Sequence, residues 1–181
     1  EGVATGIVEM EDKLITILDF EAIIAEICPE SSIQYEFKGT EVQMQARNNG
    51  HILMAEDSML LSKMIVDALH KSGYGNTVKF GNGQEAWDYL CERRDDPDEK
   101  IDDYVSCIIT DIEMPEMDGH RLTKLVKTAN QLKHVPLVIC SSLISDEMRA
   151  KGEELGADAQ ITKPEIYKLV DVVDSLTKNQ K

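Results

Sequence analysis

The segment Val105–Gly119 reads VSCIITDIEMPEMDG and lies within a chain of 181 residues. Its mainly apolar first part predicts a buried strand that ends at Thr110, directly before Asp111. Pro115 interrupts the pattern, and helical spacing of apolar residues resumes after Asp118-Gly119. The segment therefore predicts a strand that brings one carboxylate to its end, followed by a loop and a helix.

This alternation of strands and helices extends from His51 to the end of the chain. Five strands are predicted, at His51–Glu56, Thr77–Phe80, Val105–Thr110, Pro136–Cys140 and Ala159–Thr162. A helical pattern follows each of them. Strands that alternate with helices predict the α/β class, here a five-stranded doubly wound parallel sheet with helices on both faces. In such sheets, ligands bind beyond the carboxyl ends of the strands.

The N-terminal segment follows a different pattern. Short apolar runs at Ile7–Glu11 and Leu14–Phe20 predict a β-hairpin, and helical spacing follows at Asp19–Ile27. Two strands and one helix are too few to bury a core of their own. We therefore predict two units: residues 1–45 as the remnant of an incomplete second domain with its linker, and residues 50–181 as the α/β domain.

Composition excludes several classes of partner. Lysine and arginine number 19, aspartate and glutamate 34, and the formal net charge is −15. Nucleic-acid backbones and anionic lipid surfaces repel a chain with this much negative charge. We therefore expect no nucleic-acid partner. The apolar runs are too short to cross a bilayer, so we expect no membrane insertion.

The four cysteines form no Cys-x-x-Cys pair, and we expect them to be buried free thiols. Free thiols are typical of the cytoplasm, which is therefore the expected localisation.

Polar residues are predicted at or just after the strand ends, namely Glu56, Asp57, Asp111, Ser141 and Lys163. Three carboxylates at one point raise one another's pKa values, and a hard divalent cation relieves their repulsion. Oxygen ligands without histidine or cysteine favour Mg²⁺. Lys163 and Ser141 offer a positive charge and a hydroxyl donor to phosphoryl oxygens, and Asp111 is placed to attack phosphorus. Each residue alone also fits a solvated turn or a helix cap, so the hypothesis depends on their combination.

Four features carry a resemblance to a known family. They are Met54–Ser58 (MAEDS), Ile109–Gly119 (ITDIEMPEMDG), Ser141 thirty residues after Asp111, and Ile161–Pro164 (ITKP). In these features residues 51–176 resemble the receiver domain of bacterial response regulators, which has the flavodoxin/CheY-like fold. Their order and spacing are highly specific.

The resemblance implies that Asp111 accepts a phosphoryl group from a histidine kinase. It implies that Mg²⁺ is held by Glu56, Asp57, Asp111 and the backbone carbonyl of Glu113. It further implies that Ser141 and Lys163 contact the phosphoryl group and couple it to a loop rearrangement. Such a domain is not an enzyme acting on another substrate, since it assists only its own phosphorylation and dephosphorylation.

Two positions depart from the pattern of the family. Three positions before the lysine, the family often has an aromatic residue that swings inward on phosphorylation, and this chain has Gln160. After the Lys-Pro pair the family often has another aromatic residue, and this chain has Glu165. The phosphorylation chemistry does not depend on these residues, whereas the output surface does.

The N-terminal segment resembles the C-terminal tail of a CheW-like coupling domain. The resemblance rests on Gly6–Val8, Glu11–Glu21 and Ala25–Ile27. A CheW-like domain followed by a receiver is the order found in CheV-type chemotaxis proteins. It implies a histidine kinase of the CheA type and a chemoreceptor/coupling complex as partners. The apolar side chains of the hairpin and helix are expected to pack on the receiver or on a second copy of the chain, which would give a homodimer.

Two other functions compete with a signalling receiver. A phosphate-independent adaptor, or pseudo-receiver, fits the substitution at Gln160 but not the complete set of acceptor, metal ligands and lysine. An aspartate-nucleophile phosphatase typically carries a second aspartate two residues after the nucleophile, and this chain has Glu113 at that place. The sequence therefore favours the signalling receiver.

Overall fold

The computed structural model describes residues 4–10, 13–18, 47, 49–96, 98, 100–142 and 145–177. The chain divides into two compact units, Glu1–Gln34 and Tyr35–Lys181. In the first unit, β1 (Ala4–Met10) and β2 (Lys13–Leu18) pair as the predicted antiparallel hairpin. The helix predicted at Asp19–Ile27 lies outside the described residues. The domain limits at residues 1–45 and 50–181 stay a prediction.

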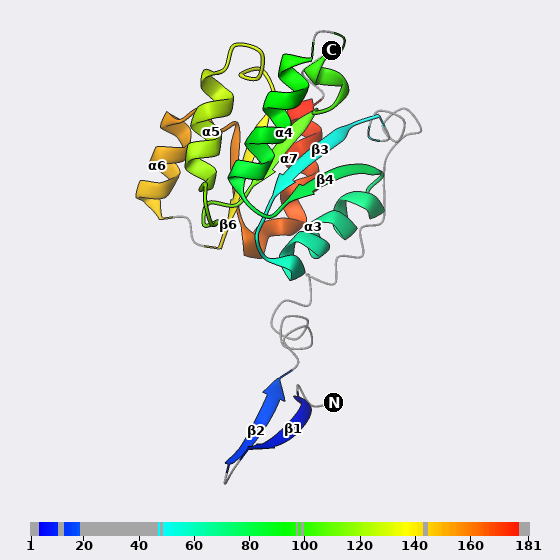
Figure 1. Ribbon diagram of the computed structural model, residues 1–181, viewed down its shortest axis with the longest axis vertical. Coiled ribbons are helices and arrows are strands. Elements are labelled where there is room, and N and C mark those ends of the chain that lie inside the picture. The colour runs from blue at the N-terminus through cyan, green and yellow to red at the C-terminus, as the bar shows by residue number, and fades with distance from the viewer. Residues whose placement is uncertain are drawn as a thin grey trace. The chain divides into compact units, whose positions relative to one another are not determined.

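The second unit contains a five-stranded parallel sheet in the order β4-β3-β5-β6-β7 (Figure 1). Its strands are β3 (His51–Ala55), β4 (Asn76–Phe80), β5 (Cys107–Thr110), β6 (Leu137–Ser141) and β7 (Ala159–Thr162). Its helices are α3 (Met59–Lys71), α4 (Gly83–Asp95), α5 (Gly119–Thr128), α6 (Asp146–Glu154) and α7 (Leu169–Thr177), with 3₁₀ helices η2 (Ile101–Asp103) and η3 (Lys163–Lys168). The predicted doubly wound α/β fold is confirmed.

The two faces of the sheet are covered by different helices. Successive side chains of a strand point to opposite faces. On one face, Leu53 and Ile108 join a buried cluster with Leu90 of α4 and Leu122 of α5. Figure 1 shows α4 in front of the sheet and α7 behind it, where α7 packs on β5. Helices therefore pack on both faces of the central strands.

Four helices begin at polar N-cap side chains. The caps are Ser58 of α3, Asn82 of α4, Asp118 of α5 and Ser145 of α6, each accepting a hydrogen bond from a backbone N–H of the first turn. Such caps satisfy N–H groups that the helix itself leaves unpaired. Each cap precedes its helix at the edge where the strands end, so the positive ends of the helix dipoles gather there. This edge of the sheet is thereby prepared for negative charge.

Two segments differ from what their sequence predicts. The charge of Glu92–Asp103 predicts a solvated connection, yet α4 extends into it and Ile101 is buried in the core cluster. The apolar spacing after Lys163 predicts one terminal helix, whereas η3 precedes α7 and has a non-helical residue at Glu165. Among the described residues, no helix combines the length and apolar character that a membrane span requires.

An ionic cluster anchors the segment that precedes β3. The Arg47 guanidinium donates through Nε to Asp174 Oδ1 over 2.9 Å and through Nη1 to the carbonyl of Ser72 over 2.7 Å. The hydroxyl of Tyr74 donates to the same Asp174 oxygen over 2.7 Å. Burial raises the pKa of Tyr74, and the neighbouring Asp174 carboxylate raises it further. Asp174 thus holds α7, the α3–β4 connection and the entry to β3 together.

We expect Asp174→Ala to lower the free energy of unfolding by about 2 kcal/mol, because Arg47 then keeps a largely buried charge without its carboxylate. Urea denaturation measures this loss. Asp171→Ala removes an exposed carboxylate from the same helix and is expected to change stability by under about 0.5 kcal/mol. Equal losses in both variants would contradict the role given to the cluster.

Candidate functional site

The carboxyl ends of β3 and β5 bring three carboxylates together. These strands are neighbours in the sheet although they are separated by β4 along the chain. The N–H of Asp111 donates to the carbonyl of Ala55 over 2.9 Å, so the backbone that follows β5 stays beside the end of β3. Oxygen atoms of Glu56, Asp57 and Asp111 all lie within 4.8 Å of one another. The sheet order reverses between β3 and β5, which is where ligands bind in this type of fold.

Lys163 joins two of these carboxylates. Its Nζ lies 2.9 Å from Asp111 Oδ2 and 3.0 Å from Glu56 Oε2. Glu56 and Asp111 are only 4% and 5% exposed, whereas Asp57 faces solvent. Three carboxylates and one ammonium leave two negative charges in the cluster. The charge and the all-oxygen donor set both fit a divalent cation such as Mg²⁺.

Burial and neighbouring charge act together on this cluster. Burial raises the pKa of Glu56, and the Asp111 carboxylate raises it further, although the Lys163 ammonium opposes both effects. For Lys163, burial alone lowers the pKa, but the hydrogen bonds to Asp111 and Glu56 outweigh this, and the net pKa is raised. Lys163 is therefore a permanent cation at neutral pH. Its ammonium donates to Oδ2 of the Asp111 carboxylate.

The loop after Asp111 holds its carboxylate from the other side. The N–H of Ile112 donates to Asp111 Oδ1 over 2.7 Å, while Oδ2 faces Lys163. The N–H of Gly119 donates to the carbonyl of Ile112 over 3.0 Å and closes the loop. Within this loop, Glu116 has a φ of 63°, a left-handed backbone conformation that residues other than glycine rarely adopt. Both carboxylate oxygens of Asp111 are thus fixed in direction.

Comparison with known proteins gives the family. The family model for the response regulator receiver domain matches residues 52–174. The chain belongs to this family.

Two curated relatives of this receiver are chemotaxis proteins of Helicobacter pylori. CheV2 is 28% identical over 163 residues and CheV3 is 28% identical over 176 residues. The matches cover 90% and 95% of this chain but 50% and 54% of those proteins. The chain therefore spans about half the length of the curated relatives it matches.

A solved structure agrees with the receiver fold. The signal receiver domain of a signal transduction histidine kinase from Syntrophus aciditrophicus is 32% identical, with a TM-score of 0.62. That comparison covers 73% of this chain and 92% of the other. The flavodoxin/CheY-like architecture predicted from the sequence is therefore confirmed.

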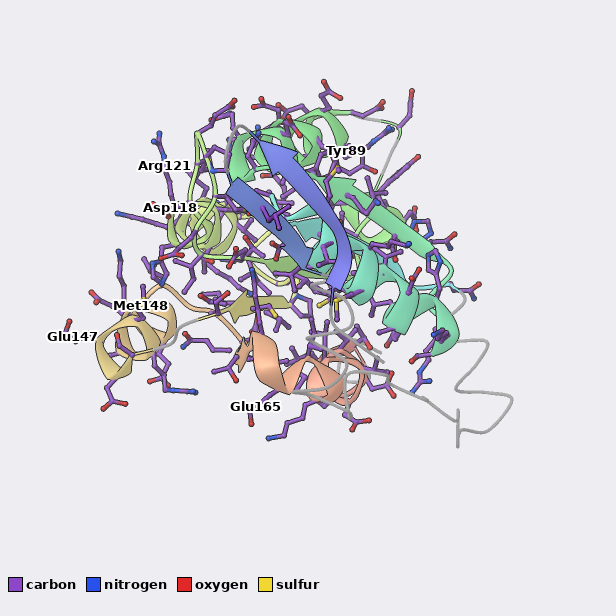
Figure 2. All side chains as sticks on the ribbon, turned by 90° about the horizontal axis from the view of Figure 1, so that it is seen from below. Tyr89, Asp118, Arg121, Glu147, Met148 and Glu165 are labelled. Atoms are coloured by element: carbon purple, nitrogen blue, oxygen red, sulfur yellow. The ribbon has the colours of Figure 1, made fainter. Side chains whose placement is uncertain are left out.

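The other predicted site residues lie at the same edge of the receiver. Ser141 is the last residue of β6, which pairs with β5, and it is buried. Glu113 lies in the loop after Asp111 with an exposed side chain. Their roles, like those of the carboxylates and of Lys163, stay predictions that this arrangement supports. Figure 2 views the structure from below and labels Asp118, the N-cap of α5, with Arg121 of α5, Glu147 and Met148 of α6, and Glu165 of η3.

The residues that replace the aromatic side chains make polar contacts. The Gln160 amide donates through Nε2 to the carbonyl of Arg149 in α6 over 2.7 Å. The amide lies so close to Gly152 that a Cβ there would be 2.5 Å from its oxygen. Glu165 accepts a hydrogen bond of 2.8 Å from the hydroxyl of Thr162. The contact between Gln160 and α6 has no signal in the sequence, because it depends on a glycine eight positions away.

We expect Gly119→Ala to disrupt the site, because a Cβ at this position would lie 1.9 Å from the carbonyl oxygen of Asp111. The first turn of α5 must then shift, at a cost of about 2 kcal/mol or more in stability. Thermal unfolding measures this cost. At Gly81, where a Cβ would have no neighbour closer than 3.9 Å, the substitution Gly81→Ala is expected to be nearly neutral.

We expect Mg²⁺ to stabilise the domain, since it binds the folded carboxylate cluster. At a concentration tenfold above its Kd, a single ligand adds about 1.4 kcal/mol, which is roughly 5 °C in Tm for a domain of this size. Differential scanning calorimetry with and without Mg²⁺ measures the shift. Asp57→Asn is expected to reduce it strongly, whereas Asp67→Asn, at an exposed position of α3, is expected to leave it unchanged. An equal shift in both variants would place the cation elsewhere.

Proposed function

We propose that this receiver accepts a phosphoryl group on Asp111 in a Mg²⁺-dependent reaction and thereby changes its protein contacts. The observation that carries the proposal is the position of Asp111. Its carboxylate lies within the three-carboxylate cluster and 2.9 Å from the Lys163 ammonium. An anionic nucleophile beside a cation site and a fixed ammonium is the arrangement that phosphoryl transfer requires.

The reaction needs no general base. One oxygen of the Asp111 carboxylate, which carries no proton when ionised, attacks phosphorus. The bond from phosphorus to the donor atom breaks, the donor leaves with the electron pair, and an acyl phosphate remains. Water later cleaves this mixed anhydride, which releases inorganic phosphate and restores the carboxylate.

The surrounding residues hold and balance the transferred charge. Glu56, Asp57, Asp111 and the carbonyl of Glu113 would hold Mg²⁺, which supplies positive charge to the phosphoryl oxygens when bound. Lys163 supplies the second positive charge, and Ser141 supplies a hydroxyl donor. The phosphoryl group brings nearly two negative charges to a site already rich in carboxylates. Movement of Ser141 and of the loop after it toward Asp111 would transmit this change to the face formed by α6 and β7.

The proposed setting is two-component signalling in chemotaxis. The likeness to CheV2 and CheV3 along most of this chain supports a phosphodonor kinase of the CheA type and a chemoreceptor/coupling complex as partners. The receiver then acts as a cytoplasmic signalling domain rather than as an enzyme on an external substrate. A CheW-like origin for residues 1–45 and a homodimer through them belong to the same proposal.

A phosphate-independent adaptor is the second candidate. The observation that favours it is the Gln160 amide, which ties β7 to the backbone of α6 where the family often has a mobile aromatic side chain. In an adaptor, the α6 face would keep one conformation whatever happens at Asp111. Proteolysis of residues 142–155 with and without phosphodonor separates the two functions, because only the signalling receiver changes its cleavage pattern.

We expect acetyl phosphate and Mg²⁺ to add one base-labile phosphoryl group to the chain, because Asp111 forms an acyl phosphate. Intact mass spectrometry measures the gain. Asp111→Asn is expected to abolish it, and Lys163→Ala to retain part of it while removing the change in proteolysis. The control Asp67→Asn is expected to label like the wild type. Full labelling of Asp111→Asn would refute the acceptor assignment.

A further inference from the structure

Thr110 places a hydroxyl group where the rest of β5 is apolar. It is the last residue of the strand, directly before Asp111, and it is 0% exposed. A buried hydroxyl costs free energy unless it makes a hydrogen bond. The Thr110 hydroxyl donates to the backbone carbonyl of Asp111 over 2.9 Å. The bond therefore acts on the backbone of the proposed acceptor itself.

That carbonyl belongs to the peptide group that joins Asp111 to Ile112. A peptide group is planar, so the direction of its carbonyl determines the direction of its N–H. The N–H of this same peptide group, on Ile112, donates to Asp111 Oδ1 over 2.7 Å. The hydroxyl of Thr110, the peptide group and the carboxylate of Asp111 thus form one chain of hydrogen bonds.

We propose that Thr110 is a positioning residue for phosphoryl acceptance at Asp111, an inference that rests on the function proposed above. Its hydroxyl holds the peptide plane, the peptide N–H holds Oδ1, and Lys163 holds Oδ2 over 2.9 Å. The carboxylate is then kept in one orientation before the phosphodonor arrives. Transfer that depends on positioning and electrostatics is sensitive to such orientation.

Close packing around the peptide group between Asp111 and Ile112 restricts its orientation. A Cβ on Gly119 would lie 1.9 Å from the Asp111 carbonyl oxygen and 3.0 Å from the Thr110 hydroxyl oxygen. The start of α5 therefore packs closely on both groups. The hydroxyl of Thr123, also fully buried, donates to the carbonyl of Gly119 over 2.7 Å and fixes that turn. Replacing the Thr110 hydroxyl with a methyl group of similar size removes the donor, so the Asp111 carbonyl loses this hydrogen bond.

The test is the rate of labelling by acetyl phosphate at saturating Mg²⁺, followed by intact mass in the full chain. Thr110→Val is expected to label about tenfold more slowly than the wild type, since the peptide plane and Oδ1 lose their fixed orientation. Thr110→Ser restores the hydroxyl and is expected to stay within about twofold of the wild-type rate. The amide proton of Ile112, followed by NMR, is expected to exchange faster in Thr110→Val only.

Ser72→Ala is the matched control. It removes a buried hydroxyl that donates to a backbone carbonyl over 2.8 Å, but at the far end of α3. It is expected to label at the wild-type rate even where its loss of stability equals that of Thr110→Val. If Thr110→Val does not fold, Thr110→Ala is compared with Thr110→Ser in the same assay.

Two results would overturn the inference. A rate for Thr110→Val within twofold of the wild type would show that the hydroxyl does not position the acceptor. A rate for Thr110→Ser as low as that for Thr110→Val would assign the effect to the methyl group and its packing. Failure of the wild type to label would instead refute the proposed function and is thereby distinguished from both.

Discussion

The Lys163 ammonium lies between two buried carboxylates, and the functional edge of the domain depends on this contact. Glu56 follows β3, Asp111 follows β5, and Lys163 follows β7, so the interaction draws on three strands. Burial disfavours each of these charges, and the two carboxylates repel each other, so the Lys163 ammonium is what stabilises both in the ionised form. The remaining excess of negative charge fits a divalent cation at this edge.

The backbone around this contact is as constrained as the side chains. Gly119 allows α5 to begin against the carbonyl of Asp111, at a separation that no other residue could occupy. The Thr110 hydroxyl donates to the carbonyl of the peptide group between Asp111 and Ile112, and the N–H of the same group donates to the Asp111 carboxylate. Helix N-termini gather at the same edge, so the local field also favours an anion there. Orientation and charge are thus built in before any ligand binds.

The opposite end of the domain is held by a second ionic cluster. The Asp174 carboxylate of α7 accepts hydrogen bonds from the Arg47 guanidinium and the Tyr74 hydroxyl, and the bond from Arg47 links the segment before β3 to the last helix. This cluster shares no residue with the edge that holds Asp111.

The order of strands and helices and the residues at the strand ends could be predicted from the amino-acid sequence. Such a prediction is possible because apolar periodicity and the turn residues at Pro115 and Gly119 are local signals. The sequence could not predict that Ile101 is buried, that η3 precedes α7, or that Gln160 rests on Gly152, since each depends on how the elements pack in three dimensions. The hydrogen bond of the Thr110 hydroxyl could not be predicted either, because in the sequence Thr110 is only one polar residue at the end of an apolar strand. These polar contacts form because folding brings the start of α5 against Thr110 of β5, and β7 against α6.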